Sequence, residues 1–215
     1  MIDIYAAAKA YEALLEQQYE FLIVRNRNTP KISLTLCFEK ADFHHLCGLH
    51  KLTDLTQMRT ESRTTIYDKI IKGTYSNDYF CKSKKCNTIL DRVQCVERLQ
   101  DILDSENTTF KFNDRVNSHS RIQADFIIKN EHLTPNLRYY YFISELKNSN
   151  GQYFGRSCFS RTKTERDYTN GHPTYTILYK ERVHISKGEK TVLYIAPSYD
   201  RERKEEESPD LSCIF

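Results

Sequence analysis

Residues 137–147 read LRYYYFISELK, and residues 173–185 read PTYTILYKERVHI. Both runs are rich in β-branched and aromatic residues and are bounded by polar or glycine-containing segments, which is typical of β-strands. Four further runs of this kind complete the second half of the chain: TTFKFN (108–113), RIQADFIIKN (121–130), YFGRSCFS (153–160) and TVLYIA (191–196). Most of the connections are too short for a crossover helix, so we expect antiparallel pairing.

The first half of the chain is predicted to be mainly helical, because its apolar residues recur at helical spacing. The expected elements are a helix at 2–19, a hairpin of strands at 20–26 and 31–38, and helices at about 40–52, 60–72 and 87–104. Helices followed by such strands define an α+β class. We therefore predict N-terminal helices and a short hairpin packed on a C-terminal antiparallel β-sheet. The helix at about 40–52 is expected to contact the strands at about 137–183 through Phe43, Leu46 and Leu49.

The composition is that of a folded protein, with 39% hydrophobic and 28% charged residues. We expect one domain over residues 1–199 and a charged flexible tail over residues 200–215. No apolar run is long enough to span a bilayer, and acidic residues interrupt the N-terminal segment where a signal peptide would be apolar. These features predict a cytoplasmic protein without a membrane partner.

The seven cysteines are odd in number and lack a secretory context, so we expect reduced thiols rather than a disulfide framework. Cys81, Cys86 and Cys95 have no second close Cys/His pair that would complete a zinc pattern. The sequence therefore predicts neither a bound metal nor another cofactor.

The formal net charge is +3, but residues 200–210 hold six acidic against three basic residues, which leaves the rest of the chain at about +6. A charge of this size is compatible with a polyanionic partner and does not require one.

The densest group of chemically active side chains is FHHLCGLHKL at 43–52, which holds three histidines and a lysine. Histidine titrates near neutral pH and so can accept and return protons. On one continuous helix, His45 and His50 would stand about 140° apart and could not share a face. An alternative reading is structural, with His44 solvated, His45 semi-buried, and His50 and Lys51 ending the helix favourably.

A second group lies in the strand half, where cations, hydroxyls and aromatic residues alternate. Such a surface can hold phosphate and stack bases. A twisted sheet with polar residues facing outward explains most of the same residues equally well. The sequence contains no glycine-rich phosphate loop, no paired-carboxylate metal site and no GxSxG motif, which removes support for nucleotide hydrolysis, two-metal nuclease chemistry and α/β-hydrolase chemistry.

Three stretches resemble a phage-associated family of the Barnase, EndoU, colicin and RelE-like nuclease group, the fourth such family. They are AAKAYEALLEQQYEFLIVRN (7–26), ISLTLCFEKADFHHLCGLHKL (32–52) and CFSRTKTERDYTNGHPTYTILYKERV (158–183). The most specific part of the resemblance is formed by Phe43, His45, Leu46 and Gly48, and the part from Tyr168 to Lys180 is looser. The resemblance implies helices packed on a curved antiparallel sheet and a ribonuclease-like activity that needs no metal.

In that chemistry a base activates the ribose 2′-hydroxyl, which attacks phosphorus, and an acid protonates the departing 5′-oxygen to leave a cyclic phosphate. The resemblance makes His45 the first candidate for acid/base work. It implies that Arg156 or Lys180 stabilises the phosphate and that a hydroxyl orients it, from Ser157, Ser160, Tyr168 or Thr176. The residues assigned to substrate binding are His50, Lys51, Ser160, Arg161 and Tyr175.

The leading hypothesis is therefore an endoribonuclease that acts as an effector or toxin of a phage or mobile element. Its expected partners are RNA, for example tRNA, and a protein inhibitor or antitoxin. The main rival is a noncatalytic module that binds protein or nucleic acid in the same conflict, and a purely structural domain is a third reading.

Overall fold

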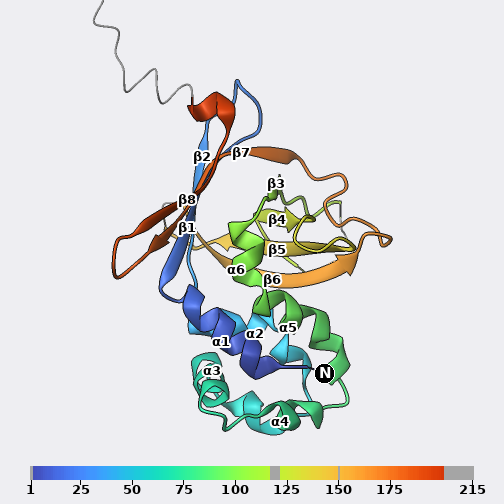
Figure 1. The fold of residues 1–215 in the computed structure, drawn as a ribbon. Coiled ribbons are helices and arrows are strands. Elements are labelled where there is room, and N and C mark those ends of the chain that lie inside the picture. Colours follow the sequence, from blue (N-terminus) through green and yellow to red (C-terminus); the bar gives the residue numbers. More distant parts are fainter. Residues whose placement is uncertain (1, 117–121, 150, 201–215) are drawn as a thin grey trace, which may run out of the picture.

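The computed structural model describes residues 2–116, 122–149 and 151–200 (Figure 1). Its helices are α1 (Ile4–Leu14), α2 (Lys40–Leu46), α3 (Arg63–Ile71), α4 (Asn77–Cys81), α5 (Leu90–Glu97) and α6 (Leu99–Asp104), with short 3-10 turns η1 (Leu49–Lys51), η2 (Thr56–Thr60) and η3 (Cys86–Ile89). Its strands are β1 (Gln17–Val24), β2 (Ile32–Leu36), β3 (Thr108–Lys111), β4 (Phe126–Asn130), β5 (Leu137–Glu145), β6 (Gln152–Thr162), β7 (Thr174–His184) and β8 (Lys190–Ile195).

The six strands predicted for the second half are confirmed, as is the β1–β2 hairpin. The first helix is shorter than predicted. It begins after Asp3, whose carboxylate accepts a hydrogen bond from the backbone N–H of Ala6, and it ends at Leu14 because the chain enters β1 at Gln17. The helix predicted at 87–104 is divided at Arg98 into α5 and α6, and α4 was not predicted.

The sheet is a closed barrel rather than the predicted curved open sheet. Seven strands follow one another in the order β1-β2-β6-β5-β4-β3-β7, and pairing of β1 with β7 closes the ring, while β8 is added to β7. The first residues of β7, Thr174 and Tyr175, pair with β3, and Tyr179–Val183 pair with β8. The pairing is antiparallel except between β2 and β6, which are parallel. Helices α1 to α5 gather at one side of this barrel, below it in Figure 1, whereas α6 is drawn across its strands.

Both faces of the β3–β6 part of the sheet are covered, which explains the uninterrupted apolar run in β5. Successive side chains of a strand point to opposite faces. Tyr139 and Tyr141 accordingly belong to a core shared with the helices, whereas Tyr140 and Phe142 belong to a second cluster with Phe159.

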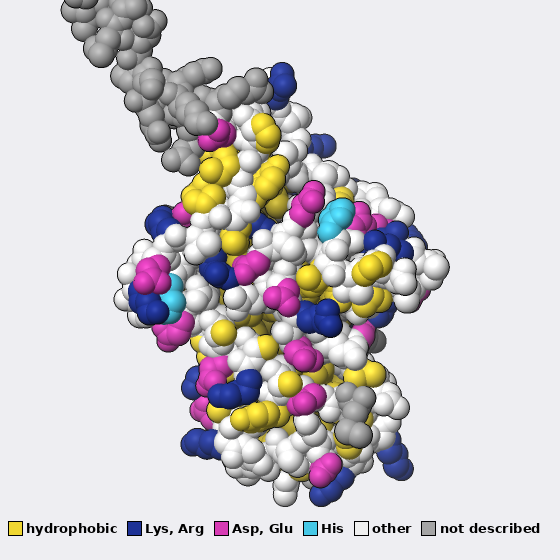
Figure 2. Space-filling model, viewed as in Figure 1, with side chains coloured by type: hydrophobic (Ala, Val, Ile, Leu, Met, Phe, Trp, Pro, Cys, Tyr) yellow, Lys and Arg dark blue, Asp and Glu magenta, His cyan; other side chains and the backbone are white. Residues whose placement is uncertain are grey.

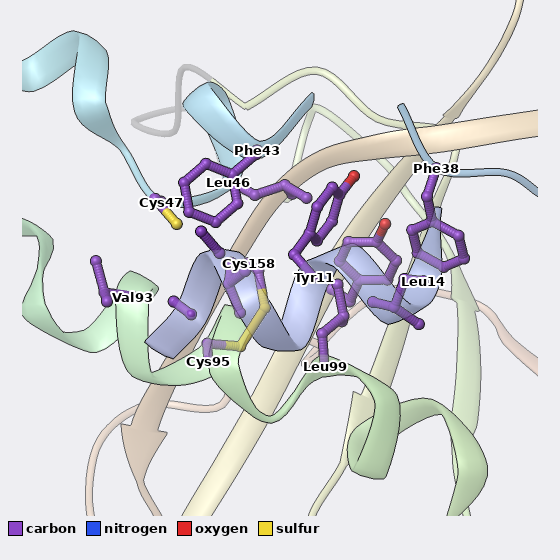
Figure 3. Close-up of a cluster of buried hydrophobic side chains, with 14 of the residues drawn as sticks. Tyr11, Leu14, Phe38, Phe43, Leu46, Cys47, Val93, Cys95, Leu99 and Cys158 are labelled. Atoms are coloured by element: carbon purple, nitrogen blue, oxygen red, sulfur yellow. A yellow bond between two sulfur atoms is a disulfide. The ribbon is translucent and has the colours of Figure 1, made fainter. Parts of the chain in front are cut away.

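The shared core joins helices to strands. In α2, Leu46 lies against Gly155 of β6, as the sequence predicted, whereas Phe43 contacts the rings of Tyr11 and Tyr67 in other helices. Figure 3 shows Tyr11, Phe43 and Leu46 within this cluster. Helix α2 therefore contacts β6 as well as α1 and α3.

A disulfide joins Cys95 of α5 to Cys158 of β6, so the expectation that all thiols are reduced is wrong at this pair (Figure 3). The two residues are 63 positions apart in the sequence, and only the packing of α5 on β6 brings them together. Among the described residues, Cys37, Cys47, Cys81 and Cys86 form no disulfide.

Within the described ranges, no helix is both long and apolar enough to cross a membrane. Acidic and basic side chains are interspersed on the face drawn in Figure 2, which carries no broad basic patch. The predicted flexible tail falls almost wholly on residues 201–215, outside the described residues.

Candidate active site

The histidine segment is not one continuous helix, which corrects the prediction that its histidines cannot share a face. Helix α2 ends at Leu46, and Gly48 adopts a left-handed conformation with φ +73°. The chain then enters the 3-10 turn η1, which contains His50. This break returns His50 toward His45, and their ring centroids lie 5.1 Å apart.

His44 completes a cluster of three imidazoles. Its ring centroid is 5.7 Å from that of His45 and 6.2 Å from that of His50. One ring nitrogen of each residue lies within 4.8 Å of the others. His44 and His45 are half-buried and His50 is exposed, so the solvated position considered for His44 is wrong.

The surroundings of the three rings lower the pKa of each imidazole, which favours its neutral form. Burial, together with the neighbouring His45 and His50, lowers the pKa of His44 to about 4. Burial also lowers the pKa of His45 to about 4, with help from the charge of Arg63. The pKa of His50 is lowered by desolvation of its ring and by the charge of Arg92. A neutral imidazole has a free lone pair and is ready to accept a proton.

A β-bulge in β6 places two adjacent residues, Arg156 and Ser157, beside this cluster. Phe142 pairs with Ser157 and the next residue of β5 pairs with Gly155, so Arg156 has no residue opposite it. Neighbouring side chains of a regular strand point to opposite faces, and a bulge suspends that rule locally. Arg156 and Ser157 consequently line the same groove as His45.

Helix α5 contributes the second guanidinium group of the site, that of Arg92. Its Nη1 donates a hydrogen bond of 2.8 Å to the Oγ of Ser157. The Cys95–Cys158 disulfide stands one turn further along α5 and one residue further along β6, so both links fix the same helix on the same strand.

These residues form what we call the histidine groove, a depression of about 860 Å³. Its lining is His45, His50, Lys51, Thr53, Lys85, Thr88, Arg92, Ile122, Gln123, Arg156 and Ser157. Four of these side chains are basic and none is acidic, so the groove is suited to an anion.

An aromatic pocket of about 370 Å³ adjoins the groove and shares Lys51 and Arg92 with it. Phe159 and Tyr168 line this pocket, and the centroids of their rings lie 5.0 Å apart. The guanidinium of Arg161 lies over the Phe159 ring at 5.0 Å and forms an ion pair with Asp91 at 2.7 Å. A flat ring flanked by guanidinium groups can stack a nucleobase.

Asp167 fixes the loop that carries Tyr168 and Arg166, which both line the pocket. Its Oδ1 accepts hydrogen bonds from the backbone N–H and hydroxyl of Thr169 and from the hydroxyl of Tyr140, at 2.7–3.1 Å. Burial opposes ionisation of Asp167, but the bonds from Thr169 and the charge of Lys129 outweigh it and bring the pKa to about 2.

Three of the predicted site residues line a different pocket. Lys180 is buried with 1% exposure, and its Nζ donates to the backbone carbonyls of Leu103 and Ser105 at 2.7 and 2.5 Å. It therefore closes the C-terminal end of α6, where a cation is favourable. Tyr175 and Thr176 line a separate pocket with Lys180.

The structure thus unites most of the predicted site in one groove and its adjoining pocket: His45, Arg156, Ser157, His50, Lys51, Arg161 and Tyr168. Ser160 lines neither. Sequence reasoning missed Arg92, because it sits within the apolar repeat of a helix that was interpreted only as core. It also missed Arg166, which lies in a loop without any motif.

The Gly48 turn offers a direct test of this assembly. An alanine Cβ at Gly48 would lie 2.7 Å from the Cδ of Arg92, in a backbone conformation that costs an L-residue about 1–2 kcal/mol. We expect Gly48→Ala to lower unfolding free energy by about that amount and to move both His50 and Arg92. Gly188→Ala is the matched control, because Gly188 also has a positive φ and its Cβ would meet nothing within 4 Å. Displacement of His50 and Arg92 that is equal in both variants would contradict the special role of the Gly48 turn.

Comparison with known proteins bears on what such a groove does. No curated protein and no solved structure matches the chain. The sequence model of one family does match, over residues 3–196 and therefore over most of the chain. The match confirms the resemblance found in the sequence, and the chain belongs to the phage-Barnase-EndoU-ColicinE5/D-RelE like nuclease 4 family.

Proposed function

We propose that the protein is a metal-independent endoribonuclease that cleaves RNA by transesterification at the ribose 2′-hydroxyl. The observation that carries the proposal is the histidine groove, which joins two neutral imidazoles to two guanidinium groups in a family of nucleases. Neutral imidazoles can move protons, and guanidinium groups can bind the phosphate whose bonds change.

His45 is proposed as the base. Its neutral ring accepts the proton of the 2′-hydroxyl, and the 2′-oxygen then forms a bond to the adjacent phosphorus. His50 is proposed as the acid, because the negative charge of a bound phosphate favours its protonated form. The bond from phosphorus to the 5′-oxygen breaks as His50 delivers a proton to that oxygen, leaving a 2′,3′-cyclic phosphate and a 5′-hydroxyl.

Arg92 and Arg156 are proposed to stabilise the additional negative charge on the nonbridging oxygens during this step. Arg92 is held in place by its hydrogen bond to Ser157 before any substrate arrives. Preorganised donors of this kind need little rearrangement during the reaction. Lys51 adds a third positive charge at the junction of the groove and the aromatic pocket.

The aromatic pocket is proposed to hold the base next to the cleaved bond. A base can stack on Phe159 or Tyr168 only if it leaves its own helical stack, which favours loops and single strands over duplex RNA. The loop of a structured RNA such as tRNA meets this requirement. We further propose that the protein acts in the cytoplasm as a phage effector or toxin, and that a protein inhibitor protects the producing cell by covering the groove.

The test compares an RNA oligonucleotide with the same oligonucleotide carrying 2′-deoxyribose throughout. We expect cleavage of the RNA only, since the deoxy strand lacks the nucleophile, whereas both strands bind and lose affinity as salt rises. Cleavage of the deoxy strand at a similar rate would exclude transesterification. Binding of RNA without any cleavage would favour a noncatalytic binding module.

A further inference from the structure

We propose that His44, His45 and His50 form a binding site for one transition-metal ion of the zinc class, and that the bound ion switches RNA cleavage off. Binding itself is independent of the proposed function, and only the inhibition rests on it. The sequence predicted no metal because the spacing of its cysteines lacks a zinc pattern, and this site contains no cysteine.

The geometry of the cluster is close to that of a metal site. Zinc binds imidazole nitrogen at about 2.0–2.1 Å, so tetrahedral ligand atoms lie roughly 3.3 Å apart. One nitrogen of each ring already lies within 4.8 Å of the others. Side-chain rotations that move the ring nitrogens by about an ångström would bring them to the separation that zinc requires. Three histidines with a fourth open position are a known ligand set for zinc.

His44 provides a second, independent observation. Its Nδ1 is buried and has no hydrogen-bond partner among the described residues. A buried polar atom without a partner is unfavourable, and its presence calls for an explanation such as an absent ion. His44 lies outside the lining of the histidine groove, so proton transfer to RNA does not explain why its ring lies beside the other two.

The charged residues around the three histidines indicate which ligand would occupy the fourth coordination position of the ion. His44 and His50 line a second depression together with Arg63 and Glu61, and the Oε2 of Glu61 is likewise buried without a partner among the described residues. The positive charges of Arg63, Arg92 and Arg156 near the rings oppose a bare cation. We therefore expect the fourth position to hold an anion, hydroxide or phosphate, whose charge the arginines balance.

A metal ion bound at this cluster would prevent the proton transfers proposed for His45 and His50. Coordination occupies the lone pairs of His45 and His50, which can then neither accept nor deliver a proton. The ion inhibits without unfolding the protein, and a chelator restores cleavage.

The binding test uses calorimetric titration of zinc chloride into chelator-stripped full-length protein without RNA. We expect one zinc ion per chain at the cluster, and a loss of affinity of about tenfold or more in His44→Ala. His132→Ala is the matched control, because His132 is exposed and outside the cluster. Cobalt should give a visible spectrum without thiolate charge-transfer absorption, which separates imidazole ligands from Cys81 and Cys86. His44→Gln, closer in volume, repeats the test if the alanine variant folds poorly.

The second arm measures RNA cleavage with and without added zinc. We expect zinc to inhibit the parent protein and His132→Ala. We expect His44→Ala to need about tenfold more zinc for the same fractional inhibition, measured against its own rate without zinc. Absence of binding, binding that His44→Ala leaves unchanged, or normal cleavage by the zinc-loaded protein would overturn the proposal. If no protein cleaves RNA even after chelation, the proposed function fails, while calorimetry still decides whether the metal site exists.

Discussion

Replacing His45 with alanine is expected to lower the rate of RNA cleavage by a factor on the order of 10² to 10⁴, the usual contribution of one acid/base group. The affinity for RNA should change little, because the positive charges that hold phosphate remain in the groove. The measurement is single-turnover cleavage in the presence of a chelator, with RNA binding determined separately.

Two comparisons make this result specific to proton transfer. Arg92→Ala should weaken RNA binding as well as catalysis, with binding effects that shrink as salt rises, since it removes a charge from the groove. His132→Ala should change neither quantity. Because His45 is half-buried, thermal unfolding of each variant must be measured as well. A stable His45→Ala protein that cleaves at the normal rate eliminates the catalytic assignment.

Replacing Cys158 with serine is expected to lower the free energy of unfolding by about 2–4 kcal/mol under oxidising conditions, because the disulfide closes a long loop in the unfolded chain. Urea denaturation of the two proteins measures the difference. Cleavage should fall as well, since the disulfide lies beside the Arg92–Ser157 hydrogen bond that shapes the groove.

Cys81→Ser is the control for this substitution, because Cys81 is exposed and free, and its effect should stay within about 0.5 kcal/mol. A thiol assay on the unfolded parent protein should find two more reactive thiols after reduction than before. Equal thiol counts, together with equal stability of the parent protein and Cys158→Ser, would show that Cys95 and Cys158 do not form this link.

The strands were predictable because local composition carries their signal. The runs around Tyr140 and Ile177 are aromatic and β-branched, and such residues favour a pleated, packed surface whichever strand lies beside them. The closure of the barrel was not predictable in this way. Pairing of Phe21 in β1 with Lys180 in β7 joins residues far apart in the chain, and neither strand carries a mark that specifies its partner.

In the candidate active site, too, some residues were predictable from local sequence and others depend on the fold. His45 was found because a histidine in a short motif is visible without a structure, and Arg156 because it lies in a run of strand residues. The approach of His50 depends on the backbone of Gly48, and the role of Arg92 depends on how α5 packs on β6. Lys180 has the right chemistry for phosphate but is buried at the end of α6, a position that only the fold determines.

The most direct test of the central claim is the end chemistry of the products formed when the purified protein is incubated with mixed cellular RNA and EDTA. The proposed mechanism predicts discrete fragments that carry a 2′,3′-cyclic phosphate on one side of the break and a 5′-hydroxyl on the other. Fragments with a 5′-phosphate and a 3′-hydroxyl, or cleavage that EDTA abolishes, would contradict metal-independent transesterification in the histidine groove.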